Sequence, residues 1–195
     1  IPIQLNSSGT IQGDVTLSSG DDFVRLGSGS EMNGVLDGNG GSDRITLDNF
    51  GFLRQTVRNF TALTKIGDLT WTLQSAVSLS GDAFVSAGTL NVAEGGRLTV
   101  PRVAVSSGAT LSGLGRVEGS VTNGGTITPA QSAQGAAFAS TLTITGDFTQ
   151  SANGVLRLRV RSAGGNDVLI VGGTATLGGT LLIDTDQVYR GGQIG

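Results

Sequence analysis

Residues 38–46, Gly-Asn-Gly-Gly-Ser-Asp-Arg-Ile-Thr, match the calcium-binding nonapeptide G-G-x-G-x-D-x-U-x everywhere except at its second place. In such repeats, oxygen atoms from loops of adjacent coils surround each ion. A related acidic stretch, Gly20-Asp21-Asp22, precedes Gly41-Ser42-Asp43. If the two stretches stack at one corner, the candidate calcium ligands are Asp21, Asp22 and Asp43. The alternative, which a single pair of loops favours, is that these side chains cap their own turns by accepting hydrogen bonds from nearby N–H groups.

Glycoside hydrolysis is a second chemistry that carboxylates could perform, and it needs two of them as acid and base or nucleophile. Asp184 and Asp186 share one face of a strand, and Asp21-Asp22 lies near Arg25. No further acidic or basic residues gather around either pair. We therefore interpret these residues as solvated turn charges, predict no catalytic residues, and regard a carbohydrate-active β-helix enzyme as the least favoured function.

The chain contains no His and no Cys, which excludes Ser-His-Asp and Cys-His catalysis as well as Cys- or His-based zinc sites. No cofactor is predicted. The 15 acidic and 12 basic residues give a formal net charge of −3, without the basic stripe that a nucleic acid would require. We expect a non-enzymatic protein that does not bind nucleic acid.

The composition and an internal repeat predict the fold. Gly accounts for 33 of the 195 residues and aromatic residues for only 5%, which is typical of many short strands joined by tight turns. When residues 11–26 are placed over residues 32–47, Val24 meets Ile45 and Leu26 meets Leu47, with the same offset in both pairs. A period of roughly 20 residues that contains strands indicates a β-solenoid, in which stacked coils bury a stripe that no single coil can bury alone.

Later segments keep the alternating pattern, although their spacing varies. Trp71 stands between Leu69 and Leu73, so we expect all three side chains to point into the core. After Pro129 the strands are longer and are separated by short Gly-containing turns, such as residues 164–167 and 178–179. These turns predict hairpins, which would form a cap over the exposed edge of the last coil.

Several phrases resemble the passenger domains of bacterial autotransporters. Residues 63–73, Leu-Thr-Lys-Ile-Gly-Asp-Leu-Thr-Trp-Thr-Leu, are similar to the family phrase LTKxGxGTWTL. The segments 88–130 and 142–182 resemble the pertactin-like autochaperone region, with phrases such as Asp167-Val-Leu-Ile-Val-Gly-Gly-Thr-Ala. The resemblance implies an all-β, right-handed parallel β-helix that folds from its C-terminal end.

The same resemblance implies type V secretion of a virulence-associated protein. The partner would be the protein's own C-terminal outer-membrane β-barrel, which is not part of this sequence. The expected location is the extracellular space or outer-membrane surface of a Gram-negative bacterium, after transit through the periplasm. Residues 1–84 would be coils of the passenger stalk, and residues 85–195 would be the autochaperone-like coils and cap. The residues expected to form the folding core are Trp71, Leu98, Leu111, Val121, Ile144, Phe148, Leu158 and Leu169.

A second hypothesis is an adhesin, in which the outer face of the coils binds a host cell surface or receptor. Phe50, Phe52 and Phe60 are the candidate contact residues, because three aromatic side chains lie close together in an otherwise aromatic-poor chain. A solenoid also has open edges at its ends. Self-association through such an edge is therefore a further candidate interaction.

Overall fold

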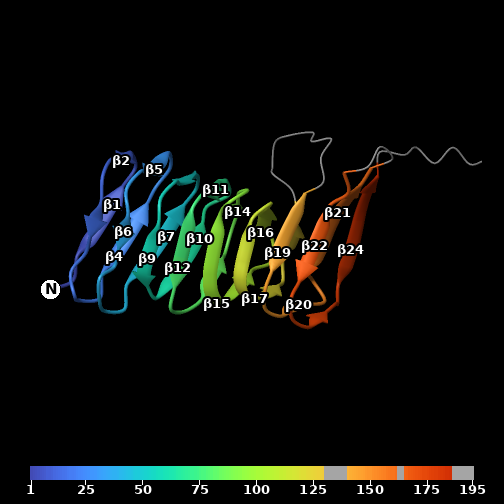
Figure 1. Cartoon of the computed structure of the whole chain (residues 1–195). Helices are drawn as coiled ribbons and strands as arrows, with labels where there is room; N and C mark the ends of the chain where they lie inside the picture. The colour runs from blue at the N-terminus through green and yellow to red at the C-terminus, as the bar shows by residue number, and fades with distance from the viewer. Residues whose placement is uncertain (130–139, 162–164, 186–195) are drawn as a thin grey trace, which may run out of the picture.

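The structure is a computed structural model of the 195-residue chain, and it describes residues 1–129, 140–161 and 165–185. These residues form 24 β-strands and no helix, so they contain no helical segment of the length and hydropathy that a membrane span requires. The strands wind into an elongated solenoid of about eight turns, with the N-terminus at one end and β24 at the other (Figure 1). The predicted all-β solenoid is confirmed.

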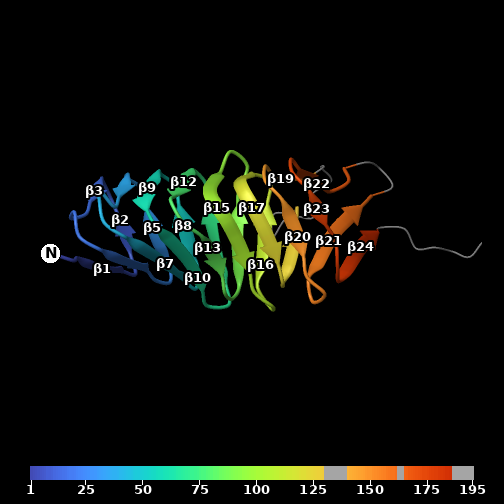
Figure 2. The same ribbon diagram turned by 90° about the horizontal axis from the view of Figure 1, so that it is seen from below.

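Each turn contributes strands to three faces, which we number by the order in which the chain first reaches them (Figures 1 and 2). Face 1 contains β1 (Gln4–Ser7), β4 (Phe23–Leu26), β7 (Arg44–Asp48), β10 (Ala62–Ile66), β13 (Ala83–Val85), the second halves of β15 (Arg97–Val105) and β17 (Arg116–Asn123), β20 (Phe148–Gln150) and β23 (Ala175–Thr176).

The strands of the other two faces follow the same order along the axis. Face 2 contains β2 (Thr10–Ile11), β5 (Ser30–Met32), β8 (Gly51–Leu53), β11 (Thr70–Leu73), β14 (Thr89–Val92), β16 (Thr110–Gly113), β18 (Thr126–Thr128), β21 (Val155–Val160) and β24 (Thr180–Thr185). Face 3 contains β3 (Val15–Thr16), β6 (Leu36–Asp37), β9 (Val57–Phe60), β12 (Ala76–Leu79), the first halves of β15 and β17, β19 (Thr141–Ile144) and β22 (Val168–Val171).

Neighbouring turns are paired in parallel throughout the described residues. In the pair β4–β7, Val24 lies beside Ile45 and Leu26 beside Leu47, which is the register that the constant offset in the sequence predicts. These four side chains are buried, whereas Arg25 between them is exposed. Alternation along each strand therefore separates the core from the surface.

One cluster of buried apolar side chains extends from Leu17 to Leu156, so the coils on both sides of residue 84 share one core. Of the eight residues expected to form a folding core, Leu158 and Leu169 are partly buried and pack against this cluster. The other six are almost completely buried: Trp71, Leu98, Leu111, Val121, Ile144 and Phe148. They therefore occupy core positions, while their role in folding stays a prediction.

The described strands after residue 140 do not form the hairpins expected for a C-terminal cap. β19, β20 and β21 pair in parallel with β22, β23 and β24. Leu142 lies beside Leu169 and Phe148 beside Ala175, so paired residues are further apart in the sequence here than in the N-terminal coils. The longer period concealed the repeat, and the strands continue the solenoid instead of folding back.

Candidate functional site

The two acidic corners of the sequence lie one above the other, because Asp22 and Asp43 directly precede the paired strands β4 and β7. The Oδ1 atom of Asp22 accepts a hydrogen bond from the Ile3 amide at 2.6 Å, and its Oδ2 atom accepts one from the Ser18 amide at 2.8 Å. The Oδ1 atom of Asp43 accepts one from the Asp22 amide at 2.7 Å. Both carboxylates thus bind the backbone of the preceding turn.

Asp21, the third candidate calcium ligand, connects turns in the opposite direction. Its Oδ1 atom accepts a hydrogen bond from the Ser42 amide, 2.8 Å away in the next turn. Within residues 1–129, 140–161 and 165–185, no group of three acidic residues is arranged to hold a metal ion. The geometry therefore favours turn capping and coil linkage for Asp21, Asp22 and Asp43 over calcium binding.

Asp43 differs electrostatically from Asp22. Burial raises the pKa of Asp43, and the nearby charges of Asp22 and Asp21 add to this effect. Its Oδ2 atom is buried without a hydrogen-bond partner. Burial would also raise the pKa of Asp22, but hydrogen bonds from Ile3 and Ser18 together outweigh it and lower this pKa. At this corner, both carboxylate oxygens of Asp22 therefore accept hydrogen bonds, whereas one carboxylate oxygen of Asp43 has no hydrogen-bond partner.

Gly38 keeps space free beside the unpartnered oxygen of Asp43. A Cβ atom at residue 38 would lie 2.5 Å from Asp43 Oδ2 and still closer to the Asn59 carbonyl oxygen. Both distances are far below van der Waals contact. The corner consequently requires glycine at this position because another strand approaches closely.

Phe60 does not belong to an exposed aromatic patch, contrary to the expectation that it contacts a partner. Its side chain is completely buried. In the pair β9–β12, Val57 lies beside Val77 but Phe60 lies beside Leu79, so β9 has one extra residue. This β-bulge, with Asn59 at a φ of 60°, turns Phe60 inward.

Phe50 and Phe52 remain on the surface and, together with Arg54, form what we call the aromatic patch. Phe50 is 41% exposed and Phe52 is half-buried. The Arg54 guanidinium lies 4.9 Å from the centre of the Phe52 ring, a cation–π geometry. Arg54 also donates a hydrogen bond of 2.9 Å to Gln74. It also forms an ion pair with Glu31 at 3.3 Å, so its orientation is fixed by three neighbours.

Trp71 fills the core, as expected, and its polar atom is satisfied. The indole Nε1 donates a hydrogen bond to the Asp48 carbonyl oxygen at 2.9 Å. Gly51 is its neighbour in the adjacent turn, and a Cβ atom there would lie 2.5 Å from the indole ring. Leu69 does not point inward as expected: it is 52% exposed and lies just outside β11, whose first residue is Thr70.

Lys65, the only lysine, was missed as a core residue. It is completely buried, and its Nζ atom donates hydrogen bonds to the carbonyl oxygens of Ile66, Gly67 and Ala87 at 2.6, 2.7 and 3.3 Å. Burial lowers the pKa of Lys65 to about 8, against the opposing charges of Asp48 and Asp68. The sequence signal was its alternation with Leu63 in one strand, which places both side chains on the inner face.

Lys65 belongs to a row of inward-facing residues that lie beside one another in successive strands of face 1. Near the C-terminal end this row contains polar residues again. Asn123 and Gln150 lie beside each other in β17 and β20, and both are buried. Asn123 Nδ2 donates to Gln150 Oε1 at 3.3 Å and to the Val155 carbonyl at 3.1 Å. Gln150 Nε2 donates to the Gly178 and Thr180 carbonyls at 2.5 and 3.1 Å. These side chains satisfy backbone carbonyls at the corner between faces 1 and 2.

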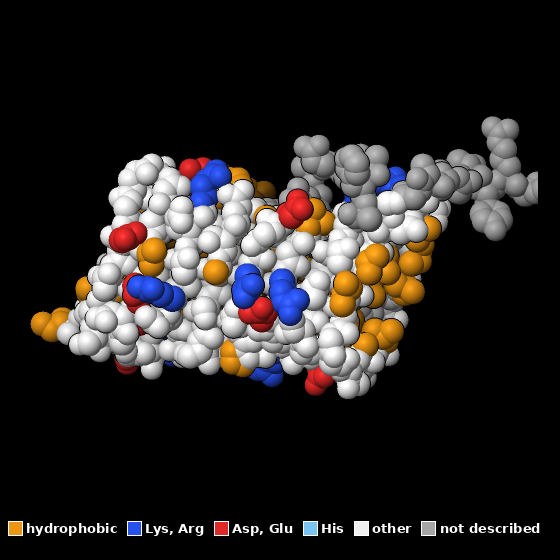
Figure 3. All heavy atoms as spheres, in the orientation of Figure 1, with side chains coloured by type: hydrophobic (Ala, Val, Ile, Leu, Met, Phe, Trp, Pro, Cys, Tyr) orange, Lys and Arg blue, Asp and Glu red, His pale blue; other side chains and the backbone are white. Residues whose placement is uncertain are grey.

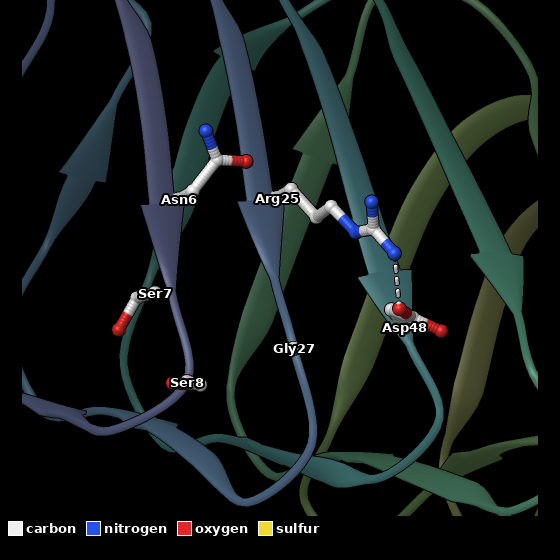
Figure 4. A pocket seen from close by; sticks show the side chains of 6 residues that line it. All are labelled: Asn6, Ser7, Ser8, Arg25, Gly27 and Asp48. Carbon is white, nitrogen blue, oxygen red and sulfur yellow. Dashed lines mark hydrogen bonds and ion pairs between the residues drawn. The ribbon is translucent and has the colours of Figure 1, made fainter.

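A shallow polar hollow of about 300 Å³ lies on face 1 near the N-terminal end (Figure 4). Asn6, Ser7, Ser8 and Gly27 line it together with an ion pair, in which Arg25 lies 2.6 Å from Asp48. This carboxylate is the only one in the hollow and is already paired. The hollow therefore does not supply the two carboxylates that glycoside hydrolysis requires.

The acidic residues near the C-terminal end also form ion pairs. Asp184 lies 2.6 Å from the Arg157 Nε atom, and Asp186 is outside the described residues. Asp167 lies 3.0 Å from Arg159, in a pair that is largely buried. The Asp167 amide also donates to the Arg159 carbonyl at 2.9 Å. The Arg159–Asp167 pair thus fastens β21 to the start of the last turn.

No protein family, curated protein or solved structure matches this chain. The sequence phrases, the fold and the local geometry are therefore the basis for inferring a function.

Proposed function

We propose that this chain is the non-enzymatic C-terminal part of a secreted autotransporter passenger and acts as a folding nucleus and stalk. In this proposal, residues 85–195 fold first at the surface of a Gram-negative bacterium, after periplasmic transit. They then present strand edges on which the preceding coils assemble. The proposal is supported by the phrases that resemble autotransporter passengers and by the parallel solenoid, which is the fold that this resemblance implies.

The observation that carries the proposal is the pairing of β15 with β17. These are the longest described strands, with nine and eight residues. Their pairing extends from Arg97 beside Arg116 to Val105 beside Asn123, with one shift of register. Each strand continues from face 3 into face 1, so it bends around a corner without an intervening loop. This pairing joins two faces into one hydrogen-bonded unit, which suits a local nucleus inside residues 85–195.

A deletion experiment tests the proposal in the secreted parent protein. Removing residues 85–195 should abolish protease-resistant display at the cell surface. The matched control removes residues 22–42, which form one complete repeat, and should preserve display because the coils on either side can restack. Undiminished display without residues 85–195, or equal loss in the control, would refute a nucleating role.

A second proposed function is adhesion to a host cell surface or receptor through the aromatic patch. The supporting observation is an exposed Phe50 at one end of β8 and, at the other end, an Arg54 that is held over Phe52. Aromatic and Arg side chains are enriched at protein interfaces relative to the rest of the surface. Binding of the labelled chain to cultured epithelial cells should fall at least about 10-fold for Phe50→Ser. Phe84→Ser, at a similarly exposed Phe on another face, is the control and should bind normally.

A further inference from the structure

Two arginine side chains lie beside each other where the chain turns from face 2 into face 3, near the middle of the solenoid. Arg97 of β15 is aligned with Arg116 of β17, and both side chains are about half exposed. Figure 3 shows basic side chains on both sides of an acidic one near the middle of the molecule. Neighbouring strands lie about 4.8 Å apart, so two like charges in this register repel each other unless an anion is close to both.

A single carboxylate provides that anion. Among the described residues, Glu118 is the only acidic residue that pairs with either arginine: its Oε1 atom lies 3.1 Å from Arg116 Nε and 3.3 Å from Arg97 Nη1. Its Oε2 atom accepts a hydrogen bond from the Thr99 hydroxyl at 2.9 Å. The hydrogen bond from Thr99, together with the two arginines, lowers the pKa of Glu118 against the effect of burial. One ionised carboxylate therefore faces two guanidinium groups.

The other ion pairs between described residues are balanced. Each remaining arginine in such a pair has an acidic partner of its own; these are Arg25, Arg54, Arg58, Arg102, Arg157 and Arg159. Glu94, the acidic residue nearest to Arg97 in the sequence, pairs with neither Arg97 nor Arg116. Among these ion pairs, the cations thus outnumber their paired anions only at Arg97 and Arg116.

A hollow of about 290 Å³ lies beside the two arginines. It is lined by Arg97, Arg116, Thr143, Leu114 and the corner glycines Gly95, Gly96 and Gly115. A Cβ atom at Gly115 would lie 2.4 Å from the Ala93 carbonyl oxygen, so the stacked corners approach each other closely there. A Cβ atom at Gly95 would have nothing within 4 Å, so the space on that side is open. The hollow is therefore accessible and is bordered by positive charge.

We propose that this hollow binds one anionic sugar unit, whose carboxylate or sulfate group is held by Arg97 and Arg116. Glu118 contacts the Nε atom of Arg116, which leaves the two Nη atoms to donate hydrogen bonds to the anionic group. The Thr143 hydroxyl can bind a sugar hydroxyl, and Leu114 gives an apolar wall for the ring. The volume is at the lower end of small-molecule sites, which begin at about 300 Å³, and it suits a single unit.

An NMR titration of the ¹⁵N-labelled chain tests the proposal. The ligand is a sulfated, uronic-acid-containing disaccharide prepared from heparin, and neutral cellobiose and inorganic sulfate are titrated separately. We expect saturable shifts of the Gly95, Gly96, Gly115 and Thr143 amide signals with the anionic disaccharide, and none with cellobiose. The dissociation constant should rise with salt, because exposed charges are screened. Sulfate should bind at least about 5-fold more weakly, since it lacks the ring contacts.

Variants separate this site from general attraction between charges. Arg97→Gln and Arg116→Gln should each weaken binding about 3–5-fold, because an exposed ionic contact contributes up to about 1 kcal/mol. Arg102→Gln is the matched control: it removes an equally exposed cation from the same strand, outside the hollow, and should bind normally. Glu118→Gln should tighten binding, because it removes the anion that competes for both guanidinium groups, whereas Asp82→Asn, which removes the partner of Arg102, should not.

Three results would overturn the proposal. The first is the absence of saturable shifts at the hollow. The second is equal weakening by Arg97→Gln and Arg102→Gln, which would show attraction to net charge alone. The third is equal affinity for sulfate and the disaccharide, which would show that no sugar is recognised. Unchanged circular dichroism spectra would show that the variants fold, and none of these results depends on the proposed role in secretion.

Discussion

Replacing Lys65 by Met should weaken the solenoid, although it removes a buried charge. Met is also unbranched, so it can follow the same path between Leu47 and Val85, the neighbours of Lys65 in adjacent turns. It cannot donate the hydrogen bonds that the ammonium makes to the carbonyls of Ile66, Gly67 and Ala87. The variant therefore leaves buried backbone acceptors without a partner.

Two opposing contributions set the size of the effect. A buried acceptor without a partner costs about 1–3 kcal/mol, and two of the lost bonds are short, at 2.6 and 2.7 Å. Removing the ammonium relieves a desolvation penalty, which lowers the pKa of Lys65 from 10.5 to about 8. Because this penalty offsets part of the loss, we expect a net destabilisation of about 1–3 kcal/mol at neutral pH.

The same pKa predicts how the difference depends on pH. Between about pH 8 and 10.5, the unfolded chain holds a proton on Lys65 that the folded chain has released. The free energy of unfolding therefore increases with pH in this window, and only in the chain that contains Lys65. The stability gap between the unaltered chain and Lys65→Met should widen as pH rises from 8 to 10.

Urea unfolding at pH 7, 8, 9 and 10, followed by circular dichroism, measures this gap. Arg25→Met is the matched control, because it removes a cation from an exposed ion pair with Asp48 and should cost less than about 1 kcal/mol at every pH. Equal stability of Lys65→Met and the unaltered chain would refute a stabilising role of the ammonium. A stability gap that narrows above pH 8 would refute the lowered pKa of Lys65.

Three further substitutions test the packing and the corner. Gly51→Ala should lower the free energy of unfolding, measured in urea, by about 1–3 kcal/mol, because its Cβ would meet the Trp71 ring and the Ser30 carbonyl. Gly9→Ala is the control, because there is open space around Gly9. Phe148→Ala should lower the free energy of unfolding by about 3–5 kcal/mol, since the ring is fully buried. A decrease of less than about 1 kcal/mol would contradict this. Because the pKa of Asp43 is raised, its contribution to folded-state stability is fully present below pH 3.8. This contribution is lost as pH rises through the folded-state pKa. Asp43→Asn should therefore gain stability relative to the unaltered chain as pH rises above 3.8, and the opposite trend in acid titrations would refute this.

The periodic features of the fold were predictable from the sequence. The constant offset between the first coils predicted the register of β4 with β7, because aligned apolar residues in stacked coils must lie beside each other. Trp71 could be placed in the core because it alternates with threonines that face outward. The strands after residue 140 were found, but their parallel pairing was not, since the repeat is longer there.

The residues whose burial was not predicted from the sequence are those for which local geometry overrides the alternation of inward and outward side chains along a strand. The extra residue in β9 turns Phe60 inward, and strand alternation alone gives no sign of such a bulge. Lys65 is buried because three carbonyls of a corner surround its ammonium, which only the folded turn brings together. The acidic residues Asp22 and Asp43 were located correctly at one corner. Their oxygens bind backbone amides, as the capping interpretation expected.

Unfolding in guanidinium, followed by two probes at low protein concentration, tests the proposed folding nucleus most directly. Trp71 is the only Trp and lies in residues 1–84, so its fluorescence reports on the N-terminal coils, whereas circular dichroism reports on all strands. We expect two steps by circular dichroism, with the fluorescence change confined to the first, because residues 85–195 should stay folded after the coils before them have unfolded. A single transition with the same midpoint for both probes would show that all coils share one stability and would contradict a separate C-terminal nucleus.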